Sequence, residues 1–143
     1  YRLEGNSLDT TLLKADYYPV SYTIATGNLY TTIDDLHRWS RILVDPVIIS
    51  LASLEEMLTP RDDVGTAGFG YAYGWITVER YGQPCIAYAG AINGFNSAIL
   101  HFRDSDITVL VLRNRKPLRE QDDVLRSIAL DIAGIIFTGA VPE

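Results

Sequence analysis

The segment Gln83–Asn114 decides the fold, and it reads QPCIAYAGAINGFNSAILHFRDSDITVLVLRN. Three short apolar runs are separated by Gly-rich and charged breaks, which is typical of an antiparallel meander. The predicted strands are Cys85–Tyr88, Asn96–Phe102 and Ile107–Leu112. The last of these barely alternates between apolar and polar residues, so we expect it to be covered on both faces and central in the sheet.

The flanking sequence adds one strand and three helices. A further strand is predicted over Tyr71–Glu79, before a turn at Tyr81–Pro84. One helix is predicted to begin after Thr31 and Thr32, because Asp34 and Asp35 follow at capping-box spacing, and to stop before Asp45-Pro46. A second is predicted between a cap at Ser50 or Ser53 and Thr59-Pro60, and a third over Leu118–Phe137.

Each predicted helix has an apolar stripe that we expect to be buried. The stripes are Ile33, Leu36, Trp39 or Ser40, Ile42 and Leu43; then Leu51, Leu54, Met57 and Leu58; and finally Val124, Leu125, Ile128, Ile132, Ile135 and Ile136. The fold class is therefore α+β, with an antiparallel sheet of three to four strands, the C-terminal helix packed on it and two helices on its N-terminal side.

Composition limits the classes of function. The 143 residues predict a single domain over 1–143, and no apolar run approaches the ~18 residues of a membrane span. The net charge of −6 argues against a nucleic-acid partner. Cys85 is the one cysteine, so an internal disulfide and a multi-thiolate metal site are excluded, and its neighbours predict a half-buried thiol. No metal or nucleotide motif occurs, so no cofactor is expected.

The residues needed for acyl-enzyme chemistry are incomplete. None of the eight serines has a lysine three positions on, so the Ser-x-x-Lys motif is absent. The two histidines are predicted at a surface position of a helix, His37, and at an outward-facing position of a strand, His101. The segment Tyr88–Ala91 carries small residues where backbone can approach a ligand, although a plain hairpin turn explains the same spacing.

Four blocks in order resemble the C-terminal half of the β-lactamase-like serine hydrolases, which include class C β-lactamases, DD-peptidases of the penicillin-binding type and related esterases. The blocks are ATGNLYTTIDDL from Ala25, FGYAYGW from Phe69, YAGAINGFNS from Tyr88 and VLVLRN from Val109. The resemblance implies part of the β-lactamase/transpeptidase-like fold. It also implies that Tyr88, Ala89 and Gly90 occupy the third active-site motif, Lys-Thr-Gly or His-x-Gly. The N–H of Ala91 would then be an oxyanion-hole donor.

The sequence departs from the family pattern in two ways. Tyr88 stands where the family has a basic or imidazole side chain, which argues against recognition of a carboxylate by that residue. Neither Ser-x-x-Lys nor Tyr-x-Asn occurs. We therefore expect a C-terminal fragment of a serine hydrolase acting on a β-lactam, peptide or ester, with no catalytic residue of its own and no activity alone.

The alternative is a non-catalytic module of the same ancestry that binds peptide or protein, or that dimerises. In the family the strand matching Ile107–Leu112 pairs with N-terminal strands, so that edge is expected to take a second copy of the chain or the missing N-terminal half. Family analogy implies a periplasmic or extracellular location.

Overall fold

The structure is a computed structural model that describes residues 2–6, 9–45, 47–63, 69–115 and 124–140. The elements, in chain order, are β1 (Arg2–Asn6), β2 (Asp9–Leu13), the short 3₁₀ helix η1 (Val20–Thr23), α1 (Ile33–Ser40), the short 3₁₀ helix η2 (Arg41–Leu43), α2 (Leu51–Leu58), β3 (Asp62–Asp63), β4 (Phe69–Ala72), β5 (Trp75–Arg80), β6 (Gln83–Ile92), β7 (Phe95–Phe102), β8 (Ile107–Arg113) and α3 (Val124–Thr138).

Strands β3 to β8 form one antiparallel sheet of six strands in sequence order, and β1 and β2 pair with each other. The predicted three to four strands were too few. The segment predicted as one strand from Tyr71 is broken at Tyr73-Gly74, where both residues have positive φ and reverse the chain. The turn Tyr81-Gly82 has positive φ at both residues too, and Asn93-Gly94 closes the β6–β7 hairpin.

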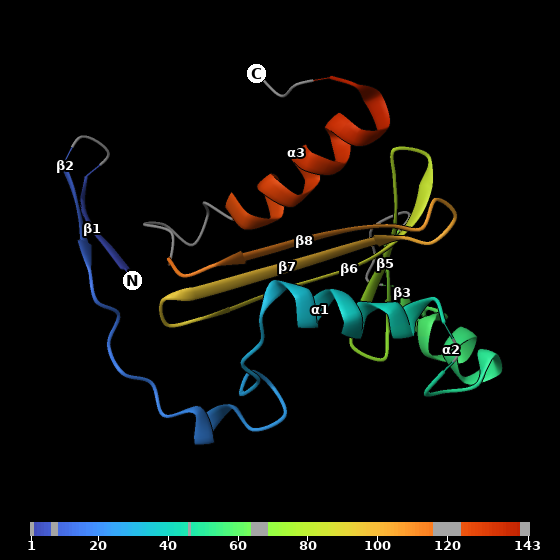
Figure 1. Cartoon of the computed structure of the whole chain (residues 1–143), viewed down its shortest axis with the longest axis horizontal. Helices are drawn as coiled ribbons and strands as arrows, with labels where there is room; N and C mark the ends of the chain where they lie inside the picture. The colour runs from blue at the N-terminus through green and yellow to red at the C-terminus, as the bar shows by residue number, and fades with distance from the viewer. Residues whose placement is uncertain (1, 7–8, 46, 64–68, 116–123, 141–143) are drawn as a thin grey trace.

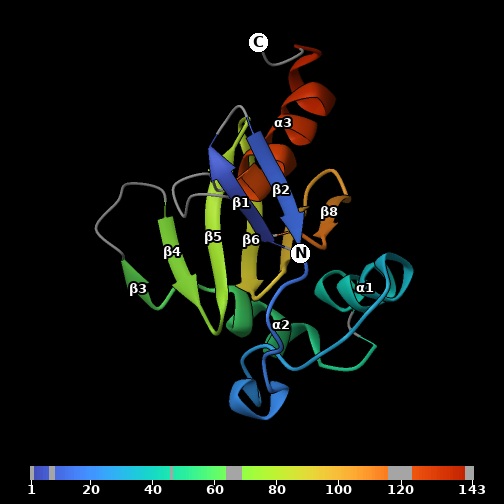
Figure 2. The same ribbon diagram turned by 90° about the vertical axis from the view of Figure 1, so that its left-hand side faces the viewer.

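Helices cover both faces of the sheet: α3 lies on one face and α1 and α2 on the other (Figure 1, and Figure 2 from the side). Strand β8 contacts both α1 and α3, as its unbroken apolar sequence predicted. Its predicted central place is wrong, because β8 is an edge strand of the described sheet. Helices on either side therefore cover the two faces of β8, while one of its edges has no neighbouring strand among the described residues.

The core beneath α3 is built around Phe102, which is fully buried and packs on the Phe137 ring. Ala129 and Ala133 are the fully buried residues in the part of α3 whose side chains the structure describes. The predicted isoleucine stripe is wrong for three members, since Ile132, Ile135 and Ile136 are exposed. Small side chains let the helix approach the large residues of the sheet, so the alanines face inward. Leu118 to Asp123, which were predicted to start this helix, lie outside the described residues.

The core beneath α1 and α2 contains Leu43, Leu54, Leu58, Trp75, Ile86 and Ile99. The N-caps were predicted correctly, because the amide of Asp35 donates to Thr32 Oγ1 and the amide of Ser53 to Ser50 Oγ. The stripes were predicted only in part. Of the two alternatives Trp39 and Ser40, Ser40 is buried and Trp39 is about half exposed. Ile33 is about half exposed too and Leu51 is exposed, because the described part of the chain covers only one side of these helices.

Candidate functional site

Strand β6 is paired on both sides over its first half only. Its register with β5 ends at Ala87, opposite Ile76, whereas its register with β7 continues to Ile92, opposite Phe95. The segment Tyr88–Ile92 therefore has a neighbour on one side and a free edge on the other within the described residues. The sequence predicted that the chain leaves the strand here, and the structure instead keeps it extended for four more residues.

The direction of the free backbone groups follows from the hairpin. A two-residue turn at Asn93-Gly94 makes Ile92 and Phe95 a hydrogen-bonded pair, and such pairs alternate along an antiparallel ladder. Gly90 and Tyr88 are then bonded to β7. The N–H and C=O groups of Ala89 and Ala91 point the other way, to the edge that β5 has left free. The structure thus presents two amide donors, one of them that of Ala91.

A hollow of about 660 Å³ lies at this end of the sheet. Its walls come from the segment between η1 and α1 and from the ends of β6, β7 and β8. It is lined by Thr26, Gly27, Leu29, Tyr30, Thr31, Tyr88, Gly90, Ala91, Ile92, Phe95, Asn96, Ser97, Leu112, Arg113 and Asn114. This volume is typical of a small-molecule site.

Small residues keep this hollow open. A Cβ added at Gly90 would meet only Ser97 Oγ, at 3.5 Å, so a ligand has space above the strand. A Cβ added at Gly27 would lie 3.5 Å from Ile92 Cγ2, an ordinary van der Waals contact, so the overlying segment packs against the end of β6.

Tyr88 and Arg113 are two of the polar residues that line the hollow. Tyr88 is 44% exposed and hydrogen-bonds to Tyr71, which raises the pKa of Tyr71 above its ordinary value. Arg113 is the one charged side chain among the described lining residues. Burial first, and the charge of Arg115 second, lower its pKa. The sequence analysis did not include Arg113 in the site, because only strand pairing brings it opposite Asn96.

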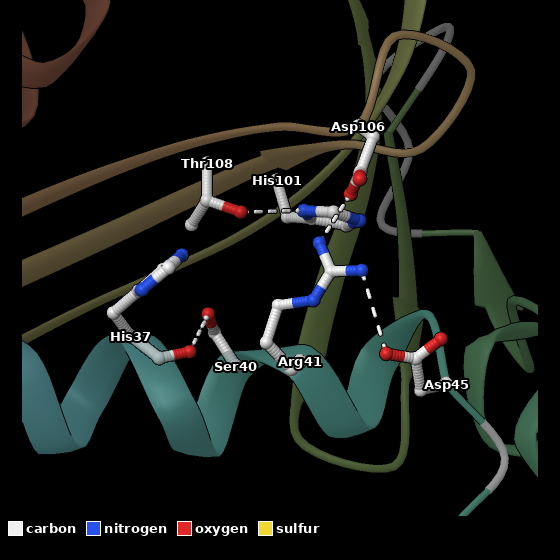
Figure 3. Close-up of polar contacts among 7 residues, drawn as sticks. All are labelled: His37, Ser40, Arg41, Asp45, His101, Asp106 and Thr108. Atoms are coloured by element: carbon white, nitrogen blue, oxygen red, sulfur yellow. Dashed lines mark hydrogen bonds and ion pairs between the residues drawn. The ribbon is translucent and has the colours of Figure 1, made fainter.

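Neither histidine lines the hollow. His37 is exposed on α1, as predicted. His101 was predicted to face outward and is instead fully buried, because α1 and η2 cover that face of the sheet. Figure 3 shows its ring beside Arg41 and Asp106, with Nδ1 2.8 Å from Thr108 Oγ1.

His101 and Cys85 are buried titratable groups that do not line the hollow. Nε2 of His101 has no hydrogen-bond partner, and burial lowers the pKa of this histidine. Cys85 is more deeply buried than predicted, and burial raises the pKa of its thiol to about 11, which makes it a poor nucleophile. Among the described residues no three His, Cys, Asp or Glu side chains are grouped as a metal site.

A family model described as Beta-lactamase matches residues 3–133. The chain belongs to the β-lactamase family. This confirms the resemblance read from the four sequence blocks, and with it membership of a superfamily of serine hydrolases.

One solved structure with the same fold is the octameric penicillin-binding protein homologue from Pyrococcus abyssi, with a TM-score of 0.65 and 23% sequence identity. The alignment covers 79% of this chain and 25% of that chain, so this chain spans about a quarter of the neighbour's length. The α+β fold class is confirmed. No curated protein matches the sequence. In the part of the chain that is described, no helix is long and apolar enough to cross a membrane.

Proposed function

We propose that this chain forms the carbonyl-binding wall of a β-lactamase-like serine hydrolase. In this proposal the free edge of β6 receives the scissile carbonyl, and the N–H of Ala91 donates to the oxyanion that develops on it. The substrate is a β-lactam, peptide or ester. The observation that carries the proposal is the unpaired stretch of β6 beside a 660 Å³ hollow lined by Tyr88 and Gly90.

The nucleophile and its base belong, in this proposal, to a segment outside these 143 residues. Ser97 is the one serine among the described lining residues, and no lysine or histidine lines the hollow to accept its proton. Nucleophile, base and oxyanion donors must all reach one carbonyl. The chain alone therefore supplies the third of these elements only.

The proposal is tested in two stages. The purified chain should give no serine-inhibitor-sensitive turnover of nitrocefin or p-nitrophenyl acetate. The coding sequence ahead of Tyr1 should contain Ser-x-x-Lys, and the longer protein should hydrolyse one of these substrates. A coding sequence without that motif, or turnover by the chain alone, would contradict the proposal.

The proposed role of Ala91 as an oxyanion donor can be tested by removing its backbone N–H. In the longer protein, Ala91→Pro removes an N–H that takes no part in pairing with β7, so the strand should persist. Loss of an oxyanion donor costs about 10²–10³-fold in kcat. Ala89→Pro is the matched control on the same free edge and should have the smaller effect. Equal effects of the two substitutions would remove the special role of Ala91.

A second candidate function is self-association through β8. By the same alternation, the N–H and C=O groups of Thr108, Leu110 and Leu112 point to the free edge of this strand. The neighbour from Pyrococcus abyssi is octameric, which supports assembly as a property worth testing here. Sedimentation should show a dimer that Leu110→Pro dissociates. A monomer whose β8 amides exchange freely with solvent would contradict this candidate.

A further inference from the structure

A separate hollow of about 220 Å³ lies on the face of the sheet that α3 covers (Figure 1). Ile76, Val78 and Arg80 line it from β5. Since the side chains of a strand alternate between its two faces, these three point to the same side of the sheet. Ala129 and Leu130 line it from α3. We call this space between β5 and α3 the α3-side hollow.

Small side chains leave the α3-side hollow open. Ala87, Ala89 and Ala98 line it, and the last two lie directly opposite each other on β6 and β7. The turn that follows β5 holds α3 beside the hollow, because the Tyr81 hydroxyl donates to the carbonyl of Leu130 at 2.7 Å. The space is therefore built from alanines on the sheet and bounded by an anchored helix.

One end of the hollow carries an arginine without a carboxylate. The Cζ atoms of Arg61 and Arg80 each lie 5.3 Å from a ring centroid, that of Tyr73 and that of Phe69 respectively. Arg61 also forms an ion pair with Glu56 at 2.7 Å. Arg80 is half-buried and donates to the carbonyl of the preceding residue, and it has no ion-pair partner among the residues that the structure describes. A carboxylate placed here would gain charge-assisted hydrogen bonds from this guanidinium.

Length and polarity narrow the occupant. Ile76 and Arg80 lie four residues apart on β5, which corresponds to about 13 Å. An extended octanoate fits within that length with its carboxylate at Arg80. An apolar cavity of about 150 Å³ already holds benzene, so about 220 Å³ admits an alkyl chain. A charged group deeper in the hollow would lose hydration without gaining a partner, so the charge belongs at the arginine end.

We propose that the α3-side hollow binds an unbranched, medium-chain alkyl carboxylate, with its tail between β5 and α3 and its carboxylate on Arg80. This goes beyond the proposed hydrolase site. Among the described residues, Tyr88 alone lines both this hollow and the larger one beside Ala91. Binding therefore requires no nucleophile, and the 143-residue chain is sufficient to test it.

An NMR titration of the chain with octanoate gives the first test. Saturable shifts should gather at the amides of β5 and at Ala129 and Leu130. Because each buried methylene adds to the affinity, octanoate should bind about tenfold more tightly than hexanoate. Shifts spread over both faces of the sheet, or an affinity that does not depend on chain length, would overturn the inference.

The charge at the end of the hollow gives the second test. Octanoate should bind about three- to fivefold more tightly than 1-octanol, and Arg80→Gln should remove this preference without changing the affinity for 1-octanol. Arg61→Gln is the matched control, since Arg61 lies at the same distance from a ring but already has Glu56 as partner. It should leave both affinities unchanged. Equal losses in the two variants, or no preference for octanoate, would overturn the role of Arg80.

The space itself gives the third test. Ala87→Leu should weaken the binding of both ligands about tenfold or more, because its larger side chain takes the place of the alkyl tail. Circular dichroism checks that the variant is folded, and Arg80→Gln decides the matter if it is not. Unchanged binding in folded Ala87→Leu would overturn the inference. So would loss of octanoate binding in the longer protein, since a further segment would then be the occupant of the hollow.

Discussion

The two ends of strand β7 have opposite surroundings. Phe102 at one end is 0% exposed and lies with its ring centroid 4.6 Å from that of Phe137. Phe95 at the other end is 51% exposed and lines the larger hollow. The same strand is therefore closed by helices at one end and open at the other. The buried core lies where both faces are covered, and the free backbone of the proposed site lies where the covering stops.

The largest expected difference between the two ends comes from deleting an aromatic ring. Phe102→Ala should lower the free energy of unfolding by about 3–5 kcal/mol, because it leaves a cavity in the core beneath α3. Phe95→Ala should cost less than about 1 kcal/mol, because its ring is half exposed. Urea unfolding of both variants measures the contrast. Similar losses would mean that the open end is as tightly packed as the closed one.

Adding one methyl group should give the next largest difference. A Cβ at Gly70 would lie 2.5 Å from Pro60 Cβ and 2.7 Å from Thr77 Oγ1, so Gly70→Ala should cost about 1–3 kcal/mol. Gly90→Ala meets no atom closer than 3.5 Å and should stay within about 0.5 kcal/mol. Thermal unfolding compares the two. A large loss of stability in Gly90→Ala would show that other atoms occupy the space above β6.

Acid should weaken the closed end through His101. Burial holds its pKa below the ordinary value of 6.5, so below pH 6.5 the unfolded chain binds a proton that the folded chain resists. Stability should then fall by at most about 1.4 kcal/mol per pH unit, levelling off below the folded pKa. Urea unfolding between pH 7.5 and 5.5 measures the slope, which His101→Gln should reduce. His37→Gln, at an exposed site, should leave it unchanged; a reversed outcome would assign the slope to His37.

The smallest effect is expected from the ion pair that joins α2 to the closed end. Arg103 Nη2 lies 2.6 Å from Glu55 Oε1, with the two side chains 32% and 53% exposed. Solvent screening limits the contribution of such a pair, so Arg103→Gln should cost about 0.5 kcal/mol or less, and less still in high salt. Unfolding at two salt concentrations checks this. A salt-independent loss would indicate packing of the arginine stem instead.

The sequence predicted local features well where one or two residues decide the geometry. The caps at Thr32 and Ser50 were correct because a side-chain oxygen satisfies a nearby amide whatever lies further away. The sequence predicted less well the features that depend on residues far apart in the chain. The break at Tyr73-Gly74 was missed because an apolar segment reads the same with or without a tight turn. The interior of α3 was misassigned because the predicted apolar stripe left out the alanines, whereas close packing buried Ala129 and Ala133.

The candidate site divides in the same way. Tyr88–Ala91 could be singled out from residue types and family resemblance, since small residues in a fixed order leave a mark on the sequence. The free edge beside Ala91 and the place of Arg113 could not be found this way. They depend on where β5 ends and on which strands and helices meet, which are contacts between residues far apart in the chain. The sequence by itself determined the family and the local turns and caps; only tertiary packing decided which backbone donors stay open.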